Sequence, residues 1–284
     1  MTNWLFGIAL GIVQGISEWL PISSKTQIII ASSFLYPALP LAQAYAFGLF
    51  LEAGTFFAAL IYFRREVWMV LKALVGRGDN EGRLLLKYLV VVTAITAVLG
   101  VVIYKTVLEA VSEASPGSVF GFPMVVLGCV LIGDSILIRM AKGRFVPTKG
   151  VGDLKLRDLV IIGIAQGIAA FPGVSRSGAT VSTMLLLGIK PEESFRLSFL
   201  ALIPASVGAT AVTVLLSGSD IGAVMSTVTL PVVLTAIAVT VLIGVVFIRV
   251  LLKAAGSKNI ALLTFALGVL AILGGVAGIL SGAG

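Results

Sequence analysis

The chain has 284 residues, of which 58% are hydrophobic and only 12% are charged, and it contains one cysteine and no histidine. Soluble domains carry about 25% charged residues, so this composition excludes a disordered chain and argues against a water-soluble globule. A polytopic membrane protein remains. The single cysteine excludes a disulfide framework, and the lack of histidine removes the usual general base and the commonest metal ligand.

In chain order, the first apolar region, 4–30, is interrupted by Pro, Gly, Ser and charged residues. A second interrupted region, 159–189, lies in the middle of the chain. Six other apolar stretches are long enough to cross about 30 Å of hydrocarbon; they are 42–63, 84–104, 119–139, 197–216, 228–249 and 259–281. We therefore predict an all-α polytopic membrane protein with six transmembrane helices and two re-entrant helical hairpins.

Basic residues are concentrated between alternate spans. Of the 20 Lys and Arg residues, 17 lie in the regions 64–87, 139–157, 190–196 and 249–258. The loops 105–118 and 217–227 contain only Lys105. The positive-inside rule places the basic regions in the cytoplasm, so the net charge of +7 indicates topology and not nucleic-acid binding. With this topology, 159–189 enters from the cytoplasm and 4–30 enters from outside.

The two interrupted regions resemble each other. Residues 11–19 align with residues 163–171 around a shared Gln-Gly-Ile core, and a Pro and a Ser follow in both. Because the hairpins insert from opposite faces, the pattern is typical of an inverted repeat. We predict a first repeat over 1–140, a cytoplasmic basic loop over 141–157 and a second repeat over 158–284.

Four ionisable residues lie deep in apolar sequence: Glu18, Lys25, Glu52 and Arg176. A charge at the bilayer centre costs about 2.5–3.5 kcal/mol, so each needs a partner or water. One interpretation is that they pair only to hold the bundle together. The other is an anion site, because the stretch 172–180 sets small residues and hydroxyls around Arg176, which suits phosphate. Oxygens of Glu18, Glu52 and Gln14 suit Mg²⁺ or Ca²⁺.

At these motifs the chain resembles the bacitracin-resistance type of undecaprenyl-diphosphate phosphatases, integral membrane enzymes that recycle a lipid carrier. The likeness covers essentially the whole chain: residues 14–24 look like the family's first motif, and 172–180 fit its second motif in full. The resemblance implies a polyprenyl diphosphate substrate, a divalent cation and an active site open to the outer face of the plasma membrane. It also implies that Glu18 is catalytic or binds metal, and that Ser175, Arg176 and Thr180 handle the diphosphate.

The chain departs from this family at two positions. Gln14 stands where the family usually has Glu, and Gln27 stands where it usually has a His proposed to be catalytic. We hypothesise that the missing carboxylate has moved to Glu52. Without histidine the nucleophile is a metal-bound water or a serine, with Ser175 favoured and Ser23 next. The residues that we expect to bind substrate are Ser24, Lys25, Gln27, Gly173, Ser177 and Thr180.

The predicted reaction converts a polyprenyl diphosphate to the monophosphate and inorganic phosphate. The main alternative is an inverted-repeat transporter or flippase of a lipid phosphate or small anion, which the broken helices and the missing histidine favour. A non-catalytic membrane subunit is a third interpretation. The complete second motif favours the phosphatase. The sequence leaves isoprenoid length and homo-oligomerisation open, because lipid-facing and partner-facing helix surfaces look alike.

Overall fold

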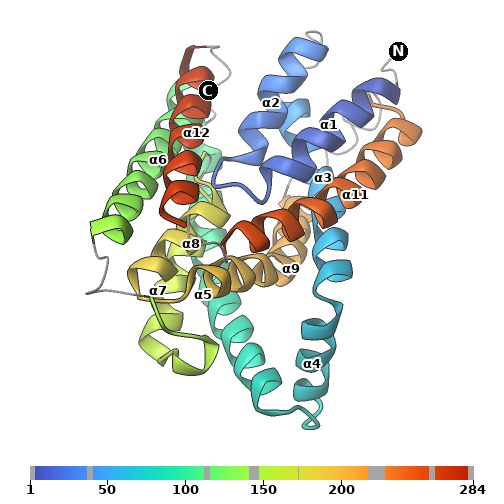
Figure 1. Ribbon diagram of the computed structural model, residues 1–284. Coiled ribbons are helices and arrows are strands. Elements are labelled where there is room, and N and C mark those ends of the chain that lie inside the picture. Colours follow the sequence, from blue (N-terminus) through green and yellow to red (C-terminus); the bar gives the residue numbers. More distant parts are fainter. Residues whose placement is uncertain are drawn as a thin grey trace.

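The protein is all-helical, as expected. The computed structural model describes residues 4–36, 41–111, 116–140, 147–171, 173–216, 228–255 and 260–280, and these contain eleven α-helices, one 3-10 turn and no strand. The elements (Figure 1) are α1 (Trp4–Ser17), α2 (Ser24–Leu35), α3 (Leu41–Tyr62), α4 (Arg64–Leu74), α5 (Asn80–Val111), α6 (Pro116–Met140), η1 (Val151–Asp153), α7 (Leu156–Ile168), α8 (Arg176–Leu186), α9 (Pro191–Leu216), α11 (Leu230–Ala255) and α12 (Ile260–Leu280).

The six predicted spans correspond to α3, α5, α6, α9, α11 and α12. Within the described residues, three helical segments are long and apolar enough to cross a membrane: Asn80–Ile103, Leu230–Ala255 and Ala261–Leu280. Two helices begin four or more residues before the predicted spans, α5 at Asn80 and α9 at Pro191. A helix can continue past the hydrocarbon because water can pair with its exposed first turn. The chain is a polytopic membrane protein.

The basic region 64–87 contains a short helix, α4, that was not predicted. Its Val67 and Val70 pack against the hydrophobic core, while its other faces carry charged side chains. Arg196 of α9 pairs with Glu66 of α4 at 3.5 Å and with Glu81 of α5 at 2.8 Å. These ion pairs join the ends of three helices on one side of the molecule.

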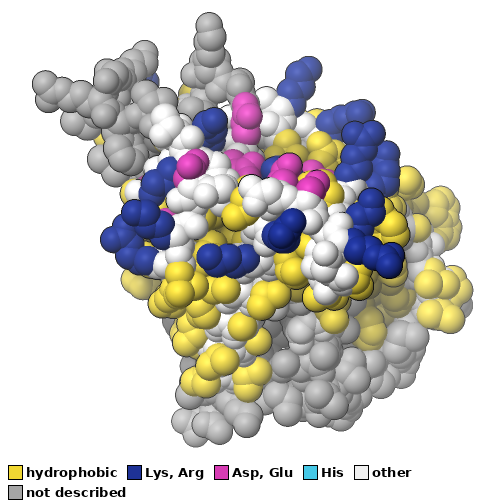
Figure 2. All heavy atoms as spheres, turned by 90° about the horizontal axis from the view of Figure 1, so that it is seen from below, with side chains coloured by type: hydrophobic (Ala, Val, Ile, Leu, Met, Phe, Trp, Pro, Cys, Tyr) yellow, Lys and Arg dark blue, Asp and Glu magenta, His cyan; other side chains and the backbone are white. Residues whose placement is uncertain are grey.

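Seen from the end where α4 lies, Lys and Arg side chains surround a smaller group of acidic ones (Figure 2). Basic side chains therefore gather on one face, as the predicted topology requires. Parts of the predicted loops lie outside the described residues, namely 112–115, 141–146, 217–227 and 256–259.

Two pairs of short helices form the predicted hairpins. Helices α1 and α2 have 14 and 12 residues, and α7 and α8 have 13 and 11. At 1.5 Å per residue each is roughly 16–21 Å long, which is too short to cross the hydrocarbon. Pro21 lies in the first turn, where it cannot continue a helix. Gly173 lies in the second turn with φ +84°, a conformation that side chains disfavour.

Each hairpin packs against a long helix from the other half of the chain: α1 lies on α11, and α7 lies on α5. Thr240 Oγ1 of α11 donates to the Gly11 carbonyl at 3.2 Å, and Thr96 Oγ1 of α5 donates to the Gly163 carbonyl at 3.3 Å. Gly11 and Gly163 are equivalent in the alignment of the two interrupted regions. The domain boundaries that we drew from that alignment stay a prediction.

Helices α6 and α12 pack tightly against each other through glycines. A Cβ on Gly121 would lie 2.6 Å from the carbonyl oxygen of Gly275, and one on Gly128 would lie 2.6 Å from that of Gly268. Small residues allow such close approach in membranes, where packing replaces the hydrophobic effect. Figure 1 shows this pair standing beside the rest of the bundle, next to α2 and α8.

Candidate active site

The tips of the two hairpins touch each other. Ser177 Oγ, at the start of α8, donates to the Leu20 carbonyl in the first hairpin at 2.8 Å, and Ser175 Oγ donates to the same oxygen at 3.3 Å. Irregular backbone at membrane depth needs such partners, because hydrocarbon offers none. Hydroxyls of the second motif therefore stabilise the turn of the first motif.

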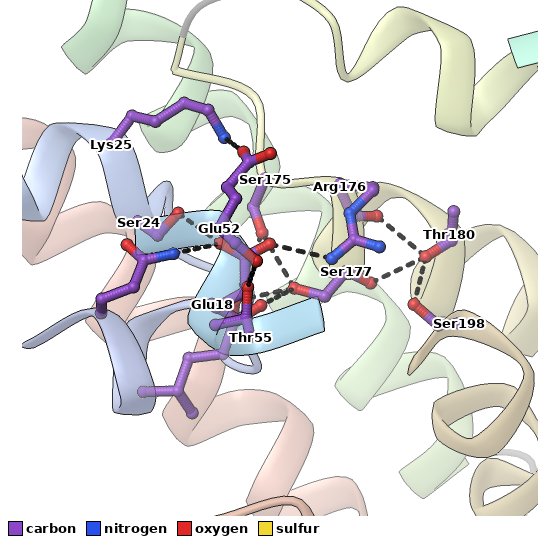
Figure 3. Close-up of polar contacts among 12 residues, drawn as sticks. Glu18, Ser24, Lys25, Glu52, Thr55, Ser175, Arg176, Ser177, Thr180 and Ser198 are labelled. Atoms are coloured by element: carbon purple, nitrogen blue, oxygen red, sulfur yellow. Dashed lines mark hydrogen bonds and ion pairs between the residues drawn. The ribbon is translucent and has the colours of Figure 1, made fainter. Parts of the chain in front are cut away.

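An ion pair lies where the tips meet. Arg176 Nη2 donates to Glu18 Oε1 at 2.9 Å, and both side chains are shielded, with exposed fractions of 17% and 9%. The other carboxylate oxygen, Oε2, accepts from Gln14 Nε2 at 3.0 Å and from Ser24 Oγ at 2.7 Å. Figure 3 shows Ser24 and Arg176 converging on Glu18 from the two hairpins. The expected meeting of Glu18 with Arg176 is confirmed.

Several groups in this cluster have hydrogen-bonding capacity left over. Among the described residues, the buried Arg176 Nη1 and Gln14 Oε1 have no hydrogen-bond partner. Ser23 precedes α2, but its side chain makes no capping hydrogen bond to that helix. Because α2 and α8 both begin here, the partial positive charges of two helix N-termini point toward the site. The cluster is suited to an anion.

Two hydroxyls of the second motif are already occupied. Ser175 Oγ caps α8 by accepting from Gly178 N at 3.2 Å, in addition to its bond to Leu20. Thr180 Oγ1 lies 2.8 Å from the Arg176 carbonyl and 2.5 Å from Ser198 Oγ. These side chains position the backbone of Arg176. Ser198 was not predicted, because nothing in the α9 sequence marks one buried serine as a partner of the second motif.

Glu52 and Lys25 form a second ion pair beside the first (Figure 3). Glu52 comes from α3 and is buried, with an exposed fraction of 8%, and its Oε1 is bonded to Lys25 Nζ from the first turn of α2. The Glu52 carboxylate is therefore close to the first motif and has a cation as its partner. Its catalytic and metal-binding roles stay predictions.

Gln27, which stands where we expected the histidine of the resembled family, faces helix α12. Its Nε2 is buried without a hydrogen-bond partner among the described residues, and it lies 3.1 Å from where a Cβ on Gly274 of α12 would stand. Within the part of the chain that the structure describes, no hydrogen bond or ion pair links Gln27 to Glu18 or Arg176, so its role in substrate binding stays a prediction.

The donor atoms fit a divalent cation only in part. Over the described ranges, no three His, Cys, Asp or Glu side chains gather as a metal site. Gln14 donates to Glu18 through its Nε2, and its Oε1 has no hydrogen-bond partner among the described residues. Mg²⁺ commonly uses one or two carboxylates and takes its other ligands from substrate phosphates and water. The set therefore fits a cation that arrives with a diphosphate.

Comparisons with known proteins all point to one family. A family described as "Bacitracin resistance protein BacA" matches residues 7–274. A protein of Saccharolobus solfataricus is 50% identical over 277 residues, covering 97% of each chain. One of Sulfurisphaera tokodaii is 45% identical over 95% of this chain and 97% of its own, and one of Pyrobaculum aerophilum is 44% identical over 94% and 95%. All three relatives are named undecaprenyl-diphosphatase.

Proposed function

The chain belongs to the bacitracin resistance protein BacA family, and from this premise we propose that it is a membrane undecaprenyl-diphosphatase. It hydrolyses the bond between the two phosphates of undecaprenyl diphosphate, releasing inorganic phosphate and leaving the lipid monophosphate. The observation that carries the proposal is the Glu18–Arg176 pair between the hairpin tips, with Arg176 Nη1 unpaired.

Arg176 binds the terminal phosphate. Its guanidinium presents planar donors that match phosphate oxygens, and one nitrogen already holds Glu18 while the other has no partner among the described residues. As the bond between the phosphates breaks, charge develops on the transferring group, and a fixed cation stabilises it most where water is excluded. The shielding of the pair favours this role.

The geometry favours Ser24 as the nucleophile, in place of Ser175. A serine is activated by a base within hydrogen-bond reach, and Ser24 Oγ donates to Glu18 Oε2 at 2.7 Å. Ser24 Oγ attacks the terminal phosphorus, its proton passes to Glu18, and the lipid monophosphate leaves. Water then attacks the phosphorus of the phosphoserine and its bond to Ser24 Oγ breaks. Glu18 returns its proton to that oxygen, and both water protons leave with the inorganic phosphate. Ser175 is less suited because its hydroxyl caps α8.

A divalent cation, Mg²⁺ or Ca²⁺, would be held by Glu18 and Gln14 together with phosphate oxygens. When bound it would neutralise phosphate charge and polarise the phosphoryl group. Glu52 is the other candidate ligand; like Glu18, it already holds a cation, here Lys25.

The protein lies in the plasma membrane, with the site open to the outer face. The gathering of basic residues at one end supports this orientation through the positive-inside rule. Single cysteines at positions 113 and 153, in a Cys129→Ser background, test it with a membrane-impermeant maleimide. We expect labelling of intact cells at 113 and not at 153; the reverse would overturn the orientation.

Activity is tested with purified protein in detergent, undecaprenyl diphosphate and Mg²⁺ or Ca²⁺. We expect release of inorganic phosphate that Arg176→Ala abolishes and Arg65→Ala, at an exposed residue of α4, preserves. Arg176→Lys keeps the charge and loses the planar fork, so it should retain little activity. Absence of release with any metal, together with movement of a lipid phosphate across vesicles, would favour the transporter.

A further inference from the structure

Lys25 and Glu52 form an ion pair that the proposed reaction has not used. They come from different elements, the first turn of α2 and the middle of α3. The stem of Lys25 also lies along α3, because a Cβ on Gly48, four residues before Glu52, would be 3.9 Å from Lys25 Cγ. Residues four apart share one helix face. The side chain of Lys25 is therefore guided along α3 to Glu52.

The position of Lys25 is unfavourable for a residue with only a structural role. A helix N-terminus carries partial positive charge, which disfavours a cation in the first turn. Lys25 is the second residue of α2, and the first turn of that helix contains no acidic residue. A local rule broken in this way is typical of functional sites. Lys25 adds positive potential where the N-termini of α2 and α8 already meet.

The four charges of the cluster are arranged as two cations around two acids. Lys25 Nζ is bonded to Glu52, and Arg176 Nη2 is bonded to Glu18. Figure 3 shows the ammonium of Lys25 and the guanidinium of Arg176 on different sides of the two carboxylates. Lys25 keeps 28% of its side-chain surface exposed, against 8% for Glu52, so the cation is the accessible member of the pair.

We propose that Lys25 binds the phosphate that stays on the lipid while Arg176 binds the terminal one, and that Glu52 is the positioning residue of Lys25. This inference rests on the proposed function, and it makes Lys25 the residue that distinguishes a diphosphate from a monophosphate. A diphosphate contacts both cations, whereas a monophosphate contacts one at a time. Glu52 holds Lys25 at the spacing that the second phosphate requires.

The test compares binding of inorganic pyrophosphate and inorganic phosphate by calorimetry, at constant free Mg²⁺. The ratio of the two dissociation constants is the readout, because loss of a merely structural ion pair would weaken both ligands alike. One charge-assisted contact contributes about 1.5–3 kcal/mol, or roughly 10- to 100-fold in affinity. We expect Lys25→Met to lower the preference for pyrophosphate by at least about tenfold, and Lys25→Arg to keep most of it.

Glu52→Gln should lower the preference for pyrophosphate part of the way, because Lys25 then loses the carboxylate that positions it. In the Lys25→Met background the same change should have no further effect on the ratio. Should Lys25→Met fold poorly, the double variant Lys25→Met/Glu52→Gln leaves no uncompensated charge and gives the same comparison. If the ratio of the two dissociation constants is unchanged in Lys25→Met, or in the double variant, the inference is overturned.

The binding measurement needs no turnover, so it separates the two proposals. Suppose that the protein releases phosphate from undecaprenyl diphosphate, but Lys25→Met keeps the preference for pyrophosphate. The proposed phosphatase activity is then supported and the role of Lys25 is rejected. A Lys25-dependent preference without any phosphate release would reject the phosphatase and retain a diphosphate-binding site.

Discussion

Removing Arg176 tests the ion pair that joins the two hairpins. In Arg176→Ala the Glu18 carboxylate stays in a site where only 9% of its side chain is exposed. Breaking a buried pair in this way costs about 3–5 kcal/mol. Because Gln14 and Ser24 still donate to Glu18, we expect the lower end, about 3 kcal/mol. With roughly 2–4 °C per kcal/mol, the midpoint of thermal unfolding should fall by about 6–12 °C.

The matched variant is Glu18→Gln/Arg176→Met, which removes both charges and keeps similar side-chain volumes. The double variant should lose about 2 kcal/mol less stability than Glu18→Gln and Arg176→Met lose together, because neither partner is left charged and buried. Thermal unfolding in one detergent, followed by tryptophan fluorescence, compares the stability of the unaltered protein, Glu18→Gln, Arg176→Met and the double variant. Arg65→Ala serves as the control. Additive losses would mean that Glu18 and Arg176 do not interact, and the proposed site would lose its basis.

Three further predictions follow from single contacts. Ser24→Ala should abolish phosphate release with little change in melting temperature. Ser175→Ala should cost about 1 kcal/mol of stability through loss of the α8 cap, and so lower the melting temperature by roughly 2–4 °C; the opposite pattern would restore Ser175 as nucleophile. Thr180→Val removes the bonds to Arg176 and Ser198 and should lower phosphate release by about tenfold, while unaltered turnover would contradict a positioning role. Gly11→Val should lower the melting temperature because its Cβ meets the Ala236 carbonyl oxygen at 2.6 Å, while Gly133→Ala, where a Cβ meets nothing within 4 Å, should not.

The parts of the fold that the sequence predicted are those set by the membrane itself. Apolar length and the distribution of basic residues gave the spans, and interruptions by Pro, Gly and charge gave the hairpins. Helix α4 was missed because a short amphipathic helix outside the hydrocarbon has no length requirement to mark it. Its Val67 and Val70 follow a helical spacing, but two residues are a weak signal beside several charges.

The site was predictable only where charge was involved. Glu18 and Arg176 had to find partners at membrane depth, and each was the other's best candidate. The sequence could not predict which serine caps a helix and which one contacts Glu18. Serine hydroxyls are chemically alike, and only the geometry of the turns decides between these roles. Ser175 therefore looked like the nucleophile from sequence, while the structure places Ser24 on the carboxylate.

The cluster carries two acids and two cations, so its formal charge is zero before a ligand enters. This neutrality allows four charged side chains to lie at membrane depth, where a single uncompensated charge would be costly. It also means that an anion must compete with Glu18 and Glu52 for the same cations. A monophosphate offers less charge with which to compete than a diphosphate does. Selection for a diphosphate can therefore arise from the resting ion pairs themselves, and the same competition would help the reaction's two monophosphate products to leave.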